Sequence, residues 1–145
     1  MSLSAFNMGC NIVAIAKNGR KYGLCVAWAQ MLDYEVISVL IGAGSVTGKM
    51  LEIKDVVGVS ALAKDQSGIA KFFGENHSDE IDKFAGIKTT LIGSSILIDG
   101  AKVMMKCQII DIQHFDFAAA DVFVIMKILS YEEDSQKSFL ALSDL

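Results

Sequence analysis

Short apolar runs rich in valine and isoleucine, separated by turn residues, make up most of this chain of 145 residues. Runs of this length and composition are typical of buried β-strands. The predicted strands are Cys10–Ala16, Lys21–Ala27, Glu35–Ile41, Val56–Leu62, Ile96–Ile98, Ala101–Ile112 and Asp121–Tyr131. Asn-Gly at 18–19 and Asp-Gly at 99–100 each stand between two runs, and both dipeptides favour the tight turn of a hairpin. The pattern therefore predicts two hairpins, one around each dipeptide.

Three short segments have helical features instead. Asp65 can cap a helix through Phe73, whose apolar residues fall on one side. Thr47–Ile53 is long enough for about two helical turns. Ser78 can cap a short helix through Phe84, with acidic residues at its positive end. Because the chain shows no repeat and no linker, we expect a single domain, residues 1–145, in which six or seven strands close into a β-barrel.

The composition narrows the class of protein. Hydrophobic residues make up 52% of the chain, yet no apolar run has the ~18–20 residues of a membrane-spanning helix. We therefore expect the apolar excess to lie in a core and in a homodimer interface. A net charge of −4 without a basic stripe argues against a nucleic-acid partner. We see no signal peptide, and three widely spaced cysteines are typical of reduced thiols, so a cytoplasmic location is expected.

The residues that most often carry catalysis or bind metals are sparse. His77 and His114 have neither the spacing nor the cysteine neighbours of a zinc or iron site. The G-x-S-x-G turn of a nucleophilic serine does not occur. Cys25 lies within a predicted strand, where we expect it to be a small buried apolar residue. No catalytic side chain and no metal ligand is predicted.

A glycine turn at Gly42-Ala43-Gly44 leads into Ser45-Val46-Thr47-Gly48-Lys49. The Rossmann pattern fails because Thr47 stands where its third glycine belongs. What remains is a helix start, whose free N–H groups favour an anion, with two hydroxyl groups and a lysine nearby. Two interpretations stay open from this segment alone: a phosphate site, or an ordinary helix cap beside a solvated lysine.

Several segments, in their order and spacing, resemble the flavin reductase-like, FMN-binding split-barrel family, which includes flavoredoxins. These segments are Gly23–Gln30, Asp33–Leu40, Ser45–Lys49, Val57–Ser60 with Asp65-Gln66, Phe73-Gly74 with His77–Phe84, and Ala101–Ile112. The resemblance runs from about Met8 to Tyr131. The chain departs from it where Asp33-Tyr34-Glu35 replaces an Asp-Pro-Pro turn, and at Cys25, where many members carry Ser, Thr or Asn.

The resemblance implies FMN bound non-covalently at a homodimer interface and, often, oxidation of NADH or NADPH. By this resemblance, Cys25 and Ala27 turn backbone groups toward the flavin, and Trp28 lies beside its ring. Ser45, Thr47 and Lys49 hold the phosphate. Ser78 and Lys83 close the site. Alternative roles are a core position for Trp28 and, for Lys83, a pairing with Asp79 one helical turn away.

Three functions are compatible with this reading. The first is an NAD(P)H:flavin oxidoreductase that passes electrons to free flavin or to a partner protein. The second is a flavoredoxin-like electron carrier without direct use of nicotinamide. The third is a non-enzymatic flavin-binding module, because a fold does not determine a function.

Overall fold

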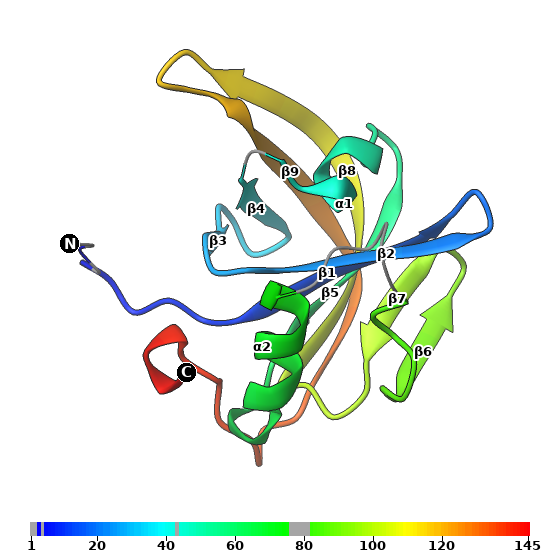
Figure 1. The fold of residues 1–145 in the computed structure, drawn as a ribbon, viewed down its shortest axis with the longest axis vertical. Helices are drawn as coiled ribbons and strands as arrows, with labels where there is room; N and C mark the ends of the chain where they lie inside the picture. Colours follow the sequence, from blue (N-terminus) through cyan, green and yellow to red (C-terminus); the bar gives the residue numbers. More distant parts are fainter. Residues whose placement is uncertain (1–2, 4, 43, 76–81) are drawn as a thin grey trace.

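A β-barrel with short helices packed on it forms the described part of the chain, which the computed structural model gives as residues 3, 5–42, 44–75 and 82–145 (Figure 1). Its strands are β1 (Asn11–Lys17), β2 (Arg20–Val26), β3 (Ala29–Met31), β4 (Val36–Ile41), β5 (Val56–Ala61), β6 (Thr89–Ile92), β7 (Ser95–Ile98), β8 (Val103–Phe115) and β9 (Ala118–Glu133). Within these residues the strands form one antiparallel sheet in the order β3-β4-β9-β8-β5-β1-β7-β6, with β2 paired to β1. The mainly β barrel predicted from the sequence is confirmed.

The first predicted hairpin is confirmed. β1 and β2 pair from Asn11↔Val26 to Lys17↔Arg20. The turn between them places Asn18 at φ 53° and Gly19 at φ 75°, the two positive values that a type I′ turn requires.

The second predicted hairpin is wrong. Gly100 has φ 85° and does turn the chain, but β7 pairs with β6, and β8 pairs with β5 and β9. The sequence reading missed β6 because its residues are largely exposed and its run is short. The hairpin that β8 does form is the long one with β9, which projects beyond the barrel in Figure 1.

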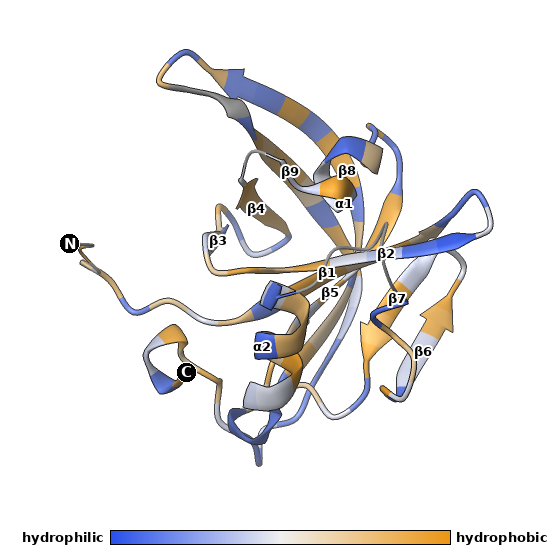
Figure 2. Cartoon of the chain, viewed as in Figure 1, coloured by the Kyte–Doolittle hydropathy of each residue, from blue (hydrophilic) through white to orange (hydrophobic). Residues whose placement is uncertain are grey.

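Two apolar clusters share β1 between them. Val13 and Ile15 point into the barrel, whereas Ile12 and Ala14 point outward beneath β7 and α2 (Ser67–Glu75). A strand buried on both faces reads as a continuous apolar run, which is why Cys10–Ala16 lacks alternation. Figure 2 shows the contrast with the β8–β9 hairpin, whose outer part alternates between apolar and polar residues.

The helices are short and differ in detail from the prediction. Lys64–Gln66 is the 3-10 turn η1, and α2 follows it, so the expected helix over Asp65–Phe73 begins with a tighter turn. A second 3-10 turn, η2 (Leu142–Asp144), ends the chain. The helix expected over Ser78–Phe84 lies largely outside the described residues, and its described end is a turn. None of the helices described is long and apolar enough to cross a membrane.

Candidate functional site

The open edge of β2 is the element on which the candidate site is built. Among the described strands, β2 pairs only with β1. In a tight hairpin, alternate residues turn their backbone groups toward the partner strand, so Gly23 and Cys25 turn theirs to the opposite edge. The Gly23 carbonyl does face away from β1, because it accepts a hydrogen bond from Lys83 Nζ at 2.9 Å. The backbone N–H and C=O of Cys25 therefore face the same open edge.

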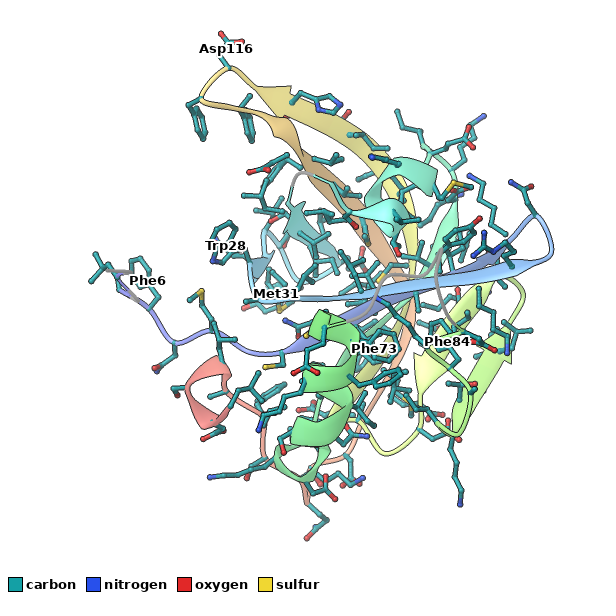
Figure 3. All side chains as sticks on the ribbon, viewed as in Figure 1. Phe6, Trp28, Met31, Phe73, Phe84 and Asp116 are labelled. Carbon is teal, nitrogen blue, oxygen red and sulfur yellow. The ribbon has the colours of Figure 1, made fainter. Side chains whose placement is uncertain are left out.

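Gly23 is a site residue that the sequence reading did not single out. A Cβ at this position would lie 2.6 Å from Phe84 Cζ and 2.9 Å from Phe73 Cε1. These two rings pack edge to face, with centroids 5.2 Å apart, and lie side by side in Figure 3. A glycine inside a predicted strand is the signal that could have revealed this close approach.

Cys25 is half-buried, so it is less enclosed than the buried position expected from the sequence. Its thiol lies beside Cys10. Burial, and to a smaller extent the Cys10 thiol, raise the pKa of Cys25 to about 12. A hydrogen bond with the Asn11 backbone and the nearby Lys83 ammonium offset part of this rise. A thiol with such a pKa stays protonated at neutral pH and is a poor nucleophile. The open edge of β2 therefore presents the backbone of Cys25 and not a reactive thiol.

Trp28 does not belong to the core, which excludes the alternative role considered for it. Its side chain is 58% exposed and lies outside the barrel beside β3 (Figure 3). Its backbone is fixed, because the Trp28 carbonyl accepts a hydrogen bond from the N–H of Leu40 at 2.9 Å. Ala27 is held in the same bend, where its carbonyl accepts from the N–H of Ala29 at 3.0 Å.

The Ser45–Lys49 segment begins the helix α1 (Val46–Met50). Ser45 Oγ caps this helix by accepting from the N–H of Gly48 at 3.1 Å. Gly48 lets α1 approach β4, since a Cβ there would lie 2.8 Å from Ile41 Cγ2. The helix is shorter than the predicted Thr47–Ile53, because Leu51 turns extended and buries its side chain in the barrel core.

The two remaining polar side chains of this segment differ sharply. Thr47 is 1% exposed, and its Oγ1 has no hydrogen-bond partner among the described residues. A buried hydroxyl without a partner is costly, so it calls for a ligand or another explanation. The Lys49 side chain is exposed at the surface of α1.

Lys83 is buried, with only 4% of its surface exposed. Its ammonium group donates to the carbonyls of Gly23 at 2.9 Å and Phe73 at 3.1 Å, and it lies 5.3 Å from the centroid of the Phe73 ring. Burial lowers the pKa of Lys83. The lysine thus ties the last turn of α2 to the open edge of β2.

The structure brings the carried-over residues into three groups around β2 and the end of β4. Cys25, Ala27 and Trp28 lie along the end of β2, Ser45, Thr47 and Lys49 on α1, and Lys83 against Gly23. Contacts of α1 and α2 with β2 link the groups. Ser78 and Asp79 lie outside the described residues. Within the described ranges, no three His, Cys, Asp or Glu side chains are placed to hold a metal ion.

The amino-acid sequence matches the flavin reductase like domain over residues 3–143. The chain belongs to the flavin reductase-like family. This membership agrees with the family resemblance read from the sequence and makes the chain a flavin-linked oxidoreductase of that family. A search of curated protein sequences gave no match.

Solved structures of similar fold agree with the family. An NADH:FAD oxidoreductase from Streptomyces globisporus has a TM-score of 0.82 at 17% identity, over 92% of this chain and 80% of the other. A flavoredoxin from Methanosarcina acetivorans has a TM-score of 0.80 at 11% identity, over 93% and 73%. An FMN-binding protein from Thermus thermophilus has a TM-score of 0.80 at 14% identity, over 90% and 74%. At these identities the likeness concerns the fold.

Proposed function

We propose that the chain binds FMN non-covalently and works as an NAD(P)H:flavin oxidoreductase. Membership of the flavin reductase-like family supports a flavin, and the FMN-binding protein of similar fold supports FMN among the flavins. The observation in this chain that carries the proposal is Thr47, whose buried hydroxyl has no partner in the described residues. An FMN phosphate at the start of α1 would satisfy it.

The residues present fit FMN along its length. Ser45, Thr47 and Lys49 would hold the phosphate with two hydroxyls and a positive charge. The backbone of Cys25 and Ala27 would face the ribityl chain, and Trp28 would flank the ring. FMN, when bound, supplies the hydride chemistry, for which the protein provides orientation and electrostatics. Lys83 would act by holding the β2 edge in place, and Ser78 is proposed on the family resemblance alone.

We propose that two copies form the functional unit. Large apolar side chains gather on the bend and loop around β3, where Trp28 is 58%, Met31 57% and Tyr34 92% exposed. Apolar surface of this kind marks protein interfaces. A mass measurement by light scattering at micromolar concentration is expected to give a dimer, and the mass of a monomer would contradict this proposal.

Cys10 and Cys25 are neighbours and both free thiols, which favours a reducing cytoplasm.

The visible spectrum of the purified protein, followed by titration with NADH and NADPH under argon, tests the function. A flavin spectrum that bleaches with either nicotinamide supports the oxidoreductase. If neither nicotinamide bleaches the flavin while a reduced carrier protein does, the chain is an electron carrier. A protein that neither copurifies with nor binds FMN contradicts the proposal.

The phosphate site has its own test in Lys49→Ala. Loss of a charge-assisted contact should weaken FMN binding by about 1–3 kcal/mol. Lys71→Ala is the matched control, because Lys71 is also exposed but lies on α2. Equal affinity in the two variants would mean that Lys49 does not reach the phosphate.

A further inference from the structure

A cavity of about 420 Å³ lies at the mouth of the barrel, and its lining includes none of the proposed flavin residues. Its floor is made of side chains that point into the barrel, among them Ile37, Val59 and Met105. The chain's N-terminal segment, β3 and the C-terminal segment form its walls. Met31, which Figure 3 labels, lines the cavity. This residue is 57% exposed and also belongs to the apolar surface proposed above as the dimer interface.

The cavity exists because small residues line it where large ones would fill the space. Gly9, Ala29, Ala61 and Ala141 all contribute to the lining. β1 and β3 do not pair, so the barrel is split at this point.

Backbone hydrogen bonds keep the walls from collapsing onto the floor. Gly9 and Ala141 form an antiparallel bridge, and the N–H of Leu142 donates to the carbonyl of Met8 at 2.7 Å. On the floor side, Ala61 pairs with both Asn11 and Val103. The cavity is therefore largely formed before any ligand arrives, as binding pockets usually are.

The lining specifies the chemistry of an occupant. No charged side chain is among the residues that line the cavity. An ionised group held against the apolar floor would lose part of its water without gaining a charged partner. The polar side chains in the lining are amides. Asn11 Nδ2 donates a hydrogen bond to the Val26 carbonyl at 3.1 Å, so its side-chain Oδ1 is the atom that could accept from an occupant. Gln30 lies at the exposed end. The volume falls within the roughly 300–1,000 Å³ of small-molecule sites.

We propose that this cavity binds a small, uncharged, mostly apolar organic molecule. None of its lining residues is among the proposed flavin residues, so the site does not depend on the proposed function. Ala29 follows Trp28 directly in the chain, which places the cavity next to the bend where the flavin ring is proposed to lie.

The test uses two fluorescent probes that differ by one charge. N-phenyl-1-naphthylamine is neutral, and 8-anilinonaphthalene-1-sulfonate is its sulfonated relative. Titration of the full chain with the neutral probe is expected to saturate at one equivalent per chain. The sulfonate should bind at least about tenfold more weakly, because it brings an unpaired charge. Equal binding of both probes would overturn the proposal.

Two variants locate the site. Ala61→Leu fills the cavity and should raise the dissociation constant of the neutral probe at least about tenfold, because the added carbons occupy its space. Ala85→Leu makes the same change at an exposed turn and should leave binding unchanged. If Ala61→Leu does not fold, Ala29→Leu on the rim serves the same purpose. An unchanged dissociation constant in a folded filling variant would place the probe elsewhere and overturn the proposal.

Two further outcomes would assign the cavity to another occupant. Displacement of the neutral probe by FMN, after correction for FMN absorbance, would make the cavity part of the flavin site. Binding that disappears when the protein dimerises would mean that a second copy fills it. A dissociation constant independent of FMN and of protein concentration supports the proposed site, even if the chain binds no FMN at all.

Discussion

The ammonium nitrogen of Lys83 lies 2.9 Å from the carbonyl oxygen of Gly23, so a buried cation closes off part of the open edge of β2. The same ammonium group reaches the carbonyl of Phe73 in the last turn of α2. The last carbonyls of a helix have no partner within the helix, and a carbonyl at a strand edge points away from the strand already paired. One side chain therefore satisfies both elements and sets their distance beside the candidate site.

Replacing Lys83 with methionine should destabilise the protein. Lys83→Met keeps a long side chain but leaves two carbonyls without their donor, at a cost of about 1–3 kcal/mol in the free energy of unfolding. Urea denaturation measures this loss. Lys88→Met is the matched control, because Lys88 is exposed, and its stability should change by less than about 0.5 kcal/mol. Equal stability of the two variants would show that the Lys83 contacts contribute nothing.

Thr47→Val should separate ligand binding from folding. Valine has nearly the shape of threonine but lacks the hydroxyl, which has no partner among the described residues. Removing an unsatisfied buried hydroxyl should leave the free energy of unfolding unchanged or raise it. FMN affinity, measured by flavin fluorescence quenching, should fall by about 1–3 kcal/mol. Thr47→Ser, which keeps the hydroxyl, should retain the affinity; a loss of stability without a loss of affinity in Thr47→Val would argue for a structural role.

The sequence predicted those parts of the fold that local signals determine. The Asn-Gly hairpin and the strand over the apolar run Cys10–Ala16 each depend on a few adjacent residues, and both are confirmed. The prediction of a hairpin at Asp99-Gly100 was wrong because a turn dipeptide indicates that the chain bends, but not which strand the chain pairs with afterwards. Lys102 donates its backbone N–H to Ala61 at 2.9 Å, so the chain passes from β7 to the far side of β5. Such long-range pairing leaves no local mark.

The candidate site was predictable only in part, for the same reason. The family resemblance placed Lys83 at the flavin site, but its partners are backbone carbonyls 60 and 10 residues away in the chain. Backbone groups have no signature in the sequence. The barrel-mouth cavity depends on small residues from four separate segments, which come together only in the folded chain.

Gly58→Ala should unfold the crossing of β5 and β7. A Cβ at Gly58 would lie 2.0 Å from the backbone oxygen of Ile96, and a backbone atom cannot rotate away as a side chain can. β7 would have to shift, which breaks the bond from the Ile98 N–H to Ser60 Oγ at 2.9 Å. We expect a loss of more than about 3 kcal/mol by thermal or urea unfolding. Gly68→Ala, in α2 with open space around it, should be neutral or stabilising by up to about 1 kcal/mol. A tolerated Gly58→Ala would contradict the close crossing.

Cys107 should make the protein less stable at alkaline pH. It is fully buried in the barrel, and burial raises its pKa from 9.0 to about 12. In the unfolded chain the thiol loses its proton near pH 9, whereas in the folded chain it keeps it, so the folded state binds more protons between pH 9 and 12. The free energy of unfolding therefore falls as the pH rises through this window, by about 1.4 kcal/mol per pH unit for this thiol.

Cys107→Ala should remove this thiol's share of the slope and leave the share of Cys25, whose pKa is also raised to about 12. Urea denaturation at pH 8, 9, 10 and 11 measures the slope. Alanine also leaves a small cavity, so the variant is less stable at every pH. Ile109→Val, two residues along the same strand and equally buried, controls for this effect. It removes core volume but no titrating group, so it should lower stability and keep the slope of the unsubstituted protein. If both variants show the same pH dependence as that protein, Cys107 ionises at an ordinary pH and is reached by water in the folded state.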